Sequence, residues 1–402
     1  MKVCLITGEF PPMQGGVGDY TSEVSKALDA LGVEVHVITS TLQDAKGRKQ
    51  EGGSNWQTAS CVLHPVVREW GWNCWRTIVK VVRQVQPDIL HVQYQAAAYG
   101  MQPAINVLPL RMRLAGADRP RTVVTFHDLR VPYLFPKAGP LRWRAVLALA
   151  RWSDAVIVTN GADQARLKPH GIQPCVIPIG SNIKPRLPGG YDRVAQRSRW
   201  GLGPDGFLLC HFGFMNERKG IETLLRALSV LVEETSLPGA PLLVMIGGKV
   251  GSSDPTNIAY VRRVEALIAK LGLEELVLWT GFVSPEEVSA SFAAADCCVL
   301  PYQEGASFQH GTLMAALAHG MAIVTTTPPN PDEQPPPAEL MAGENVLLVP
   351  PGNAGSLAAA IMRLATSPEL RRGLGEGARV LSRLFDWEGI ASQHLEVYRG
   401  LA

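Results

Sequence analysis

The chain has 402 residues, of which 46% are hydrophobic and 18% are charged. This length suits two or three domains with hydrophobic cores of their own, and this composition excludes disordered, collagen-like and coiled-coil proteins. The net charge of +2 hides an asymmetry, because residues 1–220 carry 27 Lys and Arg against 16 Asp and Glu, whereas residues 221–402 carry 11 against 20.

Short β-branched runs alternate with segments of helical periodicity along the whole chain. This pattern predicts an α/β fold, with parallel sheets covered by helices on both faces. In the first half the expected strands are Val3–Thr7, Val33–Thr39, Ile89–Tyr94, Thr122–His127, Ala155–Thr159 and Val176–Ile179. A second series, which predicts a second similar domain, comprises Phe207–Phe212, Leu242–Ile246, Val277–Thr280, Cys298–Pro301, Ala322–Thr326 and Val346–Val349.

The two series are joined by a stretch rich in Pro, Gly and Arg, between Lys184 and Asp205. Such composition is typical of an interdomain linker. We therefore expect an N-terminal domain over residues 1–185, a linker over 186–205 and a second domain over 206–385. A cleft between the two domains is the expected place for a ligand.

No segment predicts a membrane span or a secretion signal. The longest charge-free run, Gly305 to Pro331, is interrupted by histidines, glycines and a Pro-Pro pair, so it cannot cross a bilayer. The apolar run Val3–Ile6 is far too short for a signal peptide, and a cytoplasmic location is expected.

Seven cysteines are scattered along the chain without a C-x-x-C pair, so we expect neither disulfides nor structural zinc. Four of them lie within apolar runs, where a small buried side chain is the expected role. These four are Cys4, Cys210, Cys297 and Cys298.

A glycine loop, Gly15-Gly16-Val17-Gly18, follows the first strand and opens a helix. Glycines let backbone N–H groups approach an anion at a helix N-terminus. A nicotinamide or flavin site would need G-x-G-x-x-G and an acidic residue at the end of the second strand, which are missing here. A merely structural turn is the alternative.

Two adjacent cations, Arg218 and Lys219, precede Gly220 where the first strand of the second half turns into a helix. Arginine offers a planar fork for phosphate oxygens and lysine a movable point charge, so the pair suits a diphosphate. A solvated basic pair is the alternative.

Glu304 follows a later strand and precedes the helical run that starts near Thr312. A carboxylate beside an anion-binding helix end suits a polyol that bears phosphate. His310 and His319 lack metal-ligand spacing and are expected to be structural.

Taken together, these segments resemble the retaining glycosyltransferases of family four, whose GT-B fold has two Rossmann-like domains facing each other across a cleft. The resemblance covers nearly the whole chain, and its specificity comes from the order and spacing of the segments. They are Gly15-Gly16, Phe126-His127-Asp128, Ile177-Pro178-Ile179-Gly180, Arg218-Lys219-Gly220, Gly281-Phe282-Val283, Glu304 and Val349-Pro350-Pro351-Gly352. The resemblance also implies that residues 386–402 form a last helix that packs back on the first domain.

The resemblance implies a role for each matching position. Four residues form the expected catalytic set. Arg218 and Lys219 would bind the diphosphate of a UDP- or GDP-sugar. Glu304 would bind hydroxyls of the donated sugar, and His127 would lie beside the reacting centre. The expected substrate-binding residues border phosphate and acceptor (Gly15, Gly16), the base (Phe282, Val283), the phosphates (Ser307, Phe308) and the ribose (Thr312). For His127, a structural histidine satisfied by Asp128 or backbone is the alternative.

Thr312 departs from the family pattern, which has a second glutamate at this position. A hydroxyl cannot make the same paired contact with two ribose hydroxyls. We therefore expect either a different ribose contact or a low donor affinity.

The function expected is a retaining, metal-independent glycosyltransferase that moves a sugar from a nucleoside diphosphate to a hydroxyl in glycan, exopolysaccharide or glycolipid synthesis. No Asp-x-Asp occurs in the sequence, and Arg218, Lys219 and a helix dipole could neutralise the leaving diphosphate, so no cofactor or metal is expected. A nucleotide-sugar epimerase and an inactive nucleotide-sugar-binding module are the alternatives. The identity of the sugar, the base and the acceptor stays open.

The basic excess of the first half is densest between Met101 and Arg151, where nine cations oppose Asp118 and Asp128. Apolar residues are interleaved with them, a mixture that predicts docking on an anionic membrane and a lipid-linked or membrane-proximal glycan acceptor. Nucleic acid is not expected, because no nucleic-acid motif accompanies the cations. A solvated basic face is the alternative. The cations are Arg111, Arg113, Arg119, Arg121, Arg130, Lys137, Arg142, Arg144 and Arg151, and the apolar residues are Leu110, Leu114, Tyr133, Leu134, Phe135, Leu141, Trp143 and Leu147.

Overall fold

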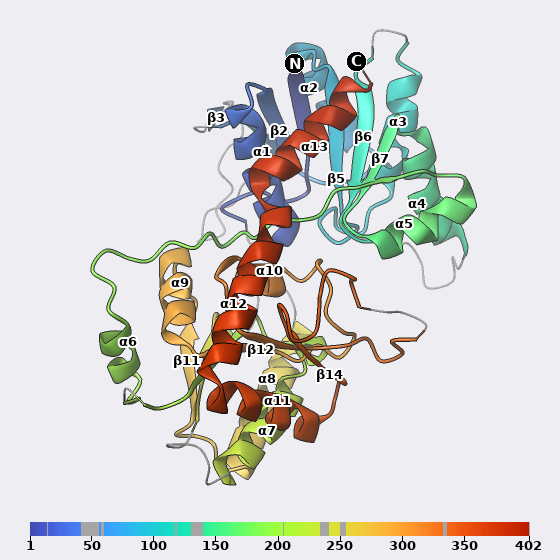
Figure 1. The fold of residues 1–402 in the computed structure, drawn as a ribbon. Helices are drawn as coiled ribbons and strands as arrows, with labels where there is room; N and C mark the ends of the chain where they lie inside the picture. Colours follow the sequence, from blue (N-terminus) through green and yellow to red (C-terminus); the bar gives the residue numbers. More distant parts are fainter. Residues whose placement is uncertain are drawn as a thin grey trace. The chain divides into compact units, whose positions relative to one another are not determined.

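The protein is described by a computed structural model that covers its 402 residues except 14, 42–55, 58–59, 117–118, 130–139, 204, 234–240, 250–254, 333–335 and 402. The chain divides into two compact units (Figure 1). Unit 1 comprises Met1–Gly180 together with Asp386–Ala402, and unit 2 comprises Ser181–Phe385.

Unit 1 contains an eight-stranded sheet in the order β3-β4-β2-β1-β5-β6-β7-β8. All neighbouring strands are parallel except β3, which runs antiparallel to β4 at one edge. The strands are β1 (Lys2–Ile6), β2 (Glu34–Ser40), β3 (Trp56–Gln57), β4 (Val62–Val67), β5 (Ile89–Tyr94), β6 (Arg121–Phe126), β7 (Ala155–Val158) and β8 (Cys175–Val176).

Helices cover both faces of this sheet, because successive strand residues point to opposite sides and both sides are apolar. Side chains of one face pack against α2 (Cys74–Val85), α3 (Ala104–Arg113) and α4 (Pro140–Trp152). Those of the other face pack against α1 (Gly16–Ala30) and α13 (Trp387–Arg399). A short helix α5 (Gly161–Leu167) and the turn η1 (Lys168–His170) join β7 to β8.

Helix α13 lies along α1 in unit 1 (Figure 1), although it follows unit 2 in the sequence. Its apolar face is buried, and two of its polar side chains bond to groups of the core. Tyr20 Oη lies 3.2 Å from His394 Nε2, and Tyr398 Oη lies 2.7 Å from His91 Nδ1. Residues 386–402 thus complete the core of unit 1.

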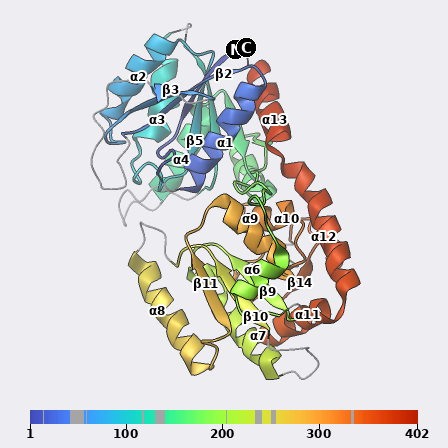
Figure 2. The same ribbon diagram turned by 90° about the vertical axis from the view of Figure 1, so that its left-hand side faces the viewer.

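Unit 2 contains a six-stranded parallel sheet in the order β11-β10-β9-β12-β13-β14. Its strands are β9 (Leu208–Phe212), β10 (Leu242–Ile246), β11 (Val277–Gly281), β12 (Cys297–Leu300), β13 (Ile323–Thr326) and β14 (Leu347–Val349). One face packs against α7 (Ile221–Glu233), α8 (Pro255–Lys270) and α11 (Ala354–Thr366), which Figure 2 shows from the side. The other helices are α6 (Arg193–Arg199), α9 (Pro285–Ala294), α10 (Gly311–Ala318) and α12 (Pro368–Ser382), with the turns η2 (Glu217–Lys219) and η3 (Arg383–Phe385).

The α/β class and the pattern of two similar parallel-sheet domains are confirmed. The structure differs from the sequence analysis in three segments. Strands β3 and β4 were not expected, and residues 186–205, expected as a linker, belong to unit 2 and contain α6. Arg197 of α6 is buried and its Nη1 bonds to Asp296 Oδ2 at 3.0 Å, so this segment is anchored to the second domain.

The four cysteines expected in the core are fully buried. No helix in the described part of the chain has both the length and the apolar character needed to cross a membrane.

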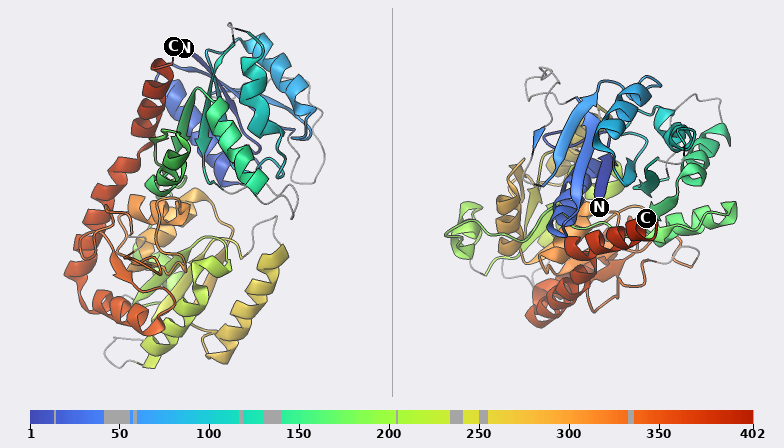
Figure 3. Two further views of the ribbon diagram at one scale, coloured as in Figure 1. Left: turned by 90° about the vertical axis from the view of Figure 1, so that its right-hand side faces the viewer. Right: turned by 90° about the horizontal axis from the view of Figure 1, so that it is seen from above.

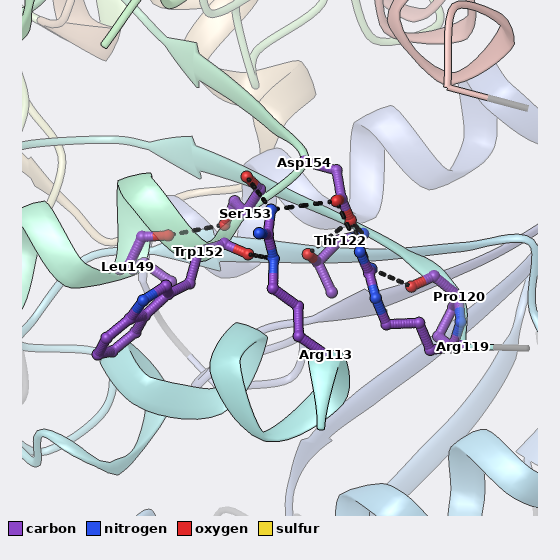
Figure 4. A network of polar contacts seen from close by, with 8 residues as sticks. All are labelled: Arg113, Arg119, Pro120, Thr122, Leu149, Trp152, Ser153 and Asp154. Atoms are coloured by element: carbon purple, nitrogen blue, oxygen red, sulfur yellow. Dashed lines mark hydrogen bonds and ion pairs between the residues drawn. The ribbon is translucent and has the colours of Figure 1, made fainter. Parts of the chain in front are cut away.

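The basic run between Met101 and Arg151 is only partly available to a partner. Asp154, just beyond that run, binds both Arg113 and Arg119, and Figure 4 shows the three side chains together. Burial raises the pKa of Asp154, but the hydrogen bonds from Arg119 and Thr122 outweigh it and lower that pKa to about 2. Leu147 is buried, contrary to its expected place in an exposed mixture. Several other members, Arg130, Tyr133, Leu134, Phe135 and Lys137, lie outside the described residues.

Candidate active site

The predicted donor-binding residues of unit 2 lie where the strand order of its sheet reverses. The chain passes from β9 to β10 and β11 on one side, and later through β12 to β13 and β14 on the other. Ligands of parallel α/β sheets bind at the carboxyl ends of the strands at such a reversal. Arg218 and Lys219 follow β9, whereas Glu304 and Thr312 follow β12.

Gly220 allows the turn with the two cations to contact the loop after β12. Its φ is +67°, and a Cβ at this position would lie 1.9 Å from the carbonyl oxygen of Pro301. The backbone N–H of Gln303 donates to the carbonyl of Arg218 at 2.8 Å. Only glycine permits both the left-handed backbone and this close approach.

Lys219 is linked to Thr312 by a direct hydrogen bond. Its Nζ donates to Thr312 Oγ1 at 2.9 Å, and the same oxygen lies 2.6 Å from Tyr302 Oη. The ammonium also lies 4.9 Å from the centre of the Tyr302 ring, a cation–π contact. Loss of hydration lowers the pKa of Lys219 from 10.5 to about 8, which still leaves the ammonium protonated at neutral pH.

Glu304 lies between a guanidinium and an imidazole. Its Oε2 is 3.9 Å from Arg218 Nη1, and its Oε1 is 3.7 Å from His310 Nε2. Arg218 and Glu304 are both more than half exposed, so they can contact a ligand. The His310 ring stacks on Tyr302 with 3.9 Å between ring centres, and burial lowers the pKa of His310.

Ser307 and Phe308 lie in the loop between Glu304 and α10. The Ser307 carbonyl accepts from the N–H of His310 at 2.9 Å, and its Oγ accepts from the N–H of Gln309 at 3.2 Å. The Phe308 ring packs against Phe385 with 4.6 Å between ring centres. The loop is thus bound to the start of α10 through Ser307 and packed against η3 through Phe308, and α10 begins without a side-chain cap among the described residues.

Phe282 and Val283 follow β11, two strands away from β9 in the sheet. Phe282 is 75% exposed, and Val283 is partly exposed. The contacts of the described residues do not join them to Arg218, Lys219 or Glu304. They form a separate, open part of the predicted site.

His127 follows β6 in unit 1. Its Nε2 lies 3.0 Å from Gln93 Oε1, and its ring makes an edge contact with Tyr20 at 4.6 Å between ring centres. Loss of hydration and the neighbouring His394 lower the pKa of His127 to about 3. The imidazole is therefore neutral at physiological pH and can serve as a hydrogen-bonding group.

Gly15 and Gly16 also belong to unit 1, where they open α1. Within the same loop the next two N–H groups are bound by the protein's own carboxylate, because Glu9 Oε1 accepts from Val17 at 3.1 Å and from Gly18 at 3.3 Å. A Cβ on Gly15 would lie 2.0 Å from Glu9 Oε1, so glycine makes room for this carboxylate. Burial raises the pKa of Glu9, although its two backbone bonds act in the opposite direction.

Sequence reasoning missed Tyr302, Glu9 and the position of His310. Tyr302 and Glu9 lie two and three residues after the carboxyl ends of β12 and β1, which is the signal that could have identified them, whereas His310 lies at the start of α10. No cluster of three or more His, Cys, Asp or Glu side chains suited to a metal occurs in the described ranges.

Two family models match the chain in succession. The model described as Glycosyltransferase Family 4 matches residues 14–184, and the model described as Glycosyl transferases group 1 matches residues 192–381. The two matches follow the division into two units closely.

Sequence relatives and solved structures of similar fold cover the whole chain. The D-inositol 3-phosphate glycosyltransferase of Corynebacterium urealyticum is 24% identical over 100% of this chain and 96% of its own length. Alignments with further proteins of that name cover 50–61% of those chains.

Among solved structures, sucrose-phosphate synthase from Thermosynechococcus elongatus has a TM-score of 0.75 at 24% identity, covering 100% of this chain and 98% of that one. The Anabaena protein HepE, solved in complex with UDP and glucose, has a TM-score of 0.71 at 19% identity, with both chains covered completely. At these identities the structures establish a shared GT-B fold.

Proposed function

Because the chain belongs to the GT-B glycosyltransferases that unite the family-four and group 1 domains, we propose that it transfers a sugar from a UDP- or GDP-sugar to a hydroxyl acceptor, with retention of configuration and without a metal. The observation that carries this proposal is the group formed by Arg218, Lys219 and Glu304 at the strand-order reversal of unit 2.

The charges of this group suit the two ends of a nucleotide-sugar. Arg218 and Lys219 can bind diphosphate oxygens through charge-assisted hydrogen bonds. Glu304, more than half exposed, can accept hydrogen bonds from sugar hydroxyls. A UDP-type donor is further supported by the structural neighbour solved with UDP and glucose.

The proposed reaction depends on stabilising a leaving group. The bond between the anomeric carbon and the diphosphate oxygen breaks while the acceptor oxygen bonds to the same face of the sugar. The departing phosphate oxygen takes the proton of the acceptor hydroxyl. Arg218 and Lys219 stabilise the negative charge that develops on the diphosphate, which is the main catalytic contribution of the protein. In this scheme His127 is neutral and orients the sugar by hydrogen bonding.

We further propose that the acceptor is a lipid-linked or membrane-proximal glycan and that the enzyme works in the cytoplasm at the inner face of the membrane. The support is the basic excess of the first half, although Arg113 and Arg119 are already bound to Asp154.

The donor is tested first by thermal unfolding with UDP, GDP and their sugars. A ligand at about 100 times its Kd adds about 2.7 kcal/mol to the free energy of unfolding. Product analysis by mass spectrometry then separates the alternatives. Transfer needs an acceptor, whereas an epimerised donor without acceptor would replace our proposal with an epimerase, and binding without turnover would indicate an inactive module.

Arg218→Ala and Lys219→Ala each remove a charged contact to the leaving diphosphate. A hydrogen bond to a charged group contributes about 1.5–3 kcal/mol, so each variant is expected to lose roughly ten- to a hundredfold in kcat/KM. Arg226→Ala on the exposed face of α7 is the matched control and should leave the kinetics unchanged. Near-normal kinetics in both site variants would refute the diphosphate assignment.

A further inference from the structure

A groove with basic walls runs over the outer face of α2 and α3 in unit 1, the two helices that lie side by side in Figure 3. Two adjoining cavities, of 660 and 710 Å³, form it and share the side chains of Val79, Arg83 and Arg111. We call this surface the α2–α3 groove. Six cations line it among the described residues: Arg76, Lys80 and Arg83 of α2, Arg111 of α3, Arg121 of β6, and Arg119, which precedes β6.

The spacing of the α2 cations explains why they share one surface. Positions 76, 80 and 83 follow helical periodicity, so the side chains line one face of α2 while Ile78, Val82 and Val85 bury the other. Arg111 extends this stripe from the neighbouring helix. The result is a continuous basic surface that points away from the sheet.

All groove cations except Arg119 lack an acidic partner among the described residues. None of these five makes an ion pair there, in contrast to Arg113 and Arg119, which share Asp154. Among the described residues that line the two cavities, Asp88 is the only acidic one, and its carboxylate accepts from the backbone N–H of Lys2 at 2.7 Å. These five cations therefore carry positive charge that no ion pair within the described part of the chain neutralises.

Exposed apolar side chains lie just before α2 and just after α3. Trp72, just before α2, is 55% exposed, and its ring contacts Trp75 edge-on at 5.1 Å between ring centres. Trp75 is fixed in turn, because its Nε1–H donates to the carbonyl of Ala104 at 2.9 Å. Leu114, directly after α3, is 74% exposed. Cations flanked by exposed tryptophan and leucine are the composition of a membrane-contacting surface.

The groove is distinct from the predicted reaction centre. Gly15, Gly16 and His127 follow the carboxyl ends of β1 and β6, whereas most of the residues that line the groove belong to α2 and α3 or to the amino-terminal edge of the sheet. At its far end the groove reaches Asp88 and Arg121, at the amino ends of β5 and β6. A partner in the groove therefore leaves the catalytic edge of unit 1 uncovered.

We propose that the α2–α3 groove docks unit 1 on a membrane containing anionic phospholipids, with headgroup phosphates among its cations and with Trp72 and Leu114 in the interfacial layer. This inference rests on the proposed function in one respect, since a membrane-bound acceptor gives the docking its purpose. It places the contact on α2 and the end of α3 rather than on the whole run from Met101 to Arg151.

Sedimentation with vesicles tests the docking without any donor or acceptor. The full chain is mixed with vesicles of phosphatidylcholine alone or with added phosphatidylglycerol, at low and high salt. Wild-type protein is expected to bind the anionic vesicles at low salt and to leave them at high salt. The triple variant Arg76→Gln, Lys80→Gln, Arg83→Gln should lose at least tenfold in vesicle affinity, and Trp72→Ala should also weaken binding.

A second triple variant of unit 2, Arg226→Gln, Arg262→Gln, Arg363→Gln, removes the same charge from exposed positions and is expected to bind like wild type. If the first triple variant fails to fold, Arg111→Gln with Arg121→Gln replaces it. The proposal is overturned if the wild type binds neutral and anionic vesicles equally well. It is also overturned if both triple variants lose the same amount of vesicle affinity. Binding to a soluble polyanion such as heparin without binding to anionic vesicles also overturns it. If vesicles bind while no sugar is transferred, the docking stands and the proposed function fails.

Discussion

The pKa of the Lys219 ammonium depends strongly on the surroundings of this side chain. Its pKa of about 8 in the folded chain is below the ordinary 10.5, so between these values the unfolded chain holds more protons and the free energy of unfolding rises with pH. Ligand binding has the opposite dependence, because a diphosphate needs the protonated ammonium. We therefore expect affinity for UDP to fall as the pH rises through about 8.

Lys219→Arg tests whether deprotonation of Lys219 causes the loss of UDP affinity at high pH, since arginine stays protonated over the range in which lysine loses its proton. Calorimetry of UDP binding at about pH 7 and about pH 9.5 should show at least a severalfold loss for the wild type and little change for the variant. The same loss in both proteins would show that another group controls the pH dependence.

Thr312 is engaged within the protein, because Lys219 and Tyr302 both bond to its hydroxyl. Thr312→Glu brings a carboxylate to the start of α10 with Lys219 as a ready partner, so the new charge is not left unpaired. We expect UDP to bind roughly tenfold more tightly through new ribose contacts.

Calorimetry with 2′-deoxy-UDP is the control for Thr312→Glu, since a gain made through the ribose should shrink with this ligand. Unchanged or weaker UDP binding in a folded variant would contradict the prediction, and would indicate that the loop after β12 has repacked around threonine.

At the scale of single elements, the attachment of α13 depends on buried hydrogen bonds as well as on apolar contacts. Tyr398→Phe removes the hydroxyl that lies 2.7 Å from His91 Nδ1 and leaves a buried polar atom poorly satisfied. The expected cost is about 1–3 kcal/mol of unfolding free energy.

Tyr191→Phe is a matched control for Tyr398→Phe, because the Tyr191 hydroxyl is buried and has no hydrogen-bond partner in the described part of the protein. Urea denaturation of both variants measures the difference. An equal effect of the two substitutions would show that the bond to His91 does not stabilise the helix.

Most strands could be predicted because residues buried on both faces form short, continuous apolar runs. Strand β4 escaped prediction because His64 and Pro65 interrupt its apolar run, and proline usually argues against a strand interior. Helix α6 escaped because its arginines resemble a solvated linker, whereas Arg197 is buried against Asp296.

The candidate site was only partly predictable. The sequence places Arg218, Lys219, Glu304 and Thr312 after strands, and the rule for parallel sheets brings strand ends together. The bond between Lys219 and Thr312 joins residues 93 positions apart and depends on which strands are neighbours, so no local pattern shows it. No local pattern shows the role of Glu9 either, because its bonds to the N–H groups of Val17 and Gly18 depend on the path of the glycine loop.

At the scale of the whole molecule, the two units differ in how their chains are assembled. Unit 2 is one continuous segment, Ser181–Phe385, whereas unit 1 needs two separate segments. We therefore expect the fragment 181–385 to fold by itself and to bind UDP. The fragment 1–180 is expected to aggregate or to remain partly unfolded, because the apolar surface that α13 covers is exposed.

Circular dichroism and calorimetry of the two fragments check this expectation. A fusion of residues 1–180 through a flexible linker to residues 386–402 is the control, and should recover a cooperative unfolding transition. A stable fragment 1–180 would contradict our view of α13 as part of the core.

The position of α13 in the sequence also bears on biosynthesis. Domains of multidomain proteins generally fold in order as they leave the ribosome, with the N-terminal one first. Here the N-terminal unit lacks one of its covering helices until all of unit 2 has been translated. The part of its apolar sheet face that α13 covers thus stays exposed throughout that period, which is the situation that nascent-chain chaperones relieve. The first unit to emerge from the ribosome is the last to finish folding.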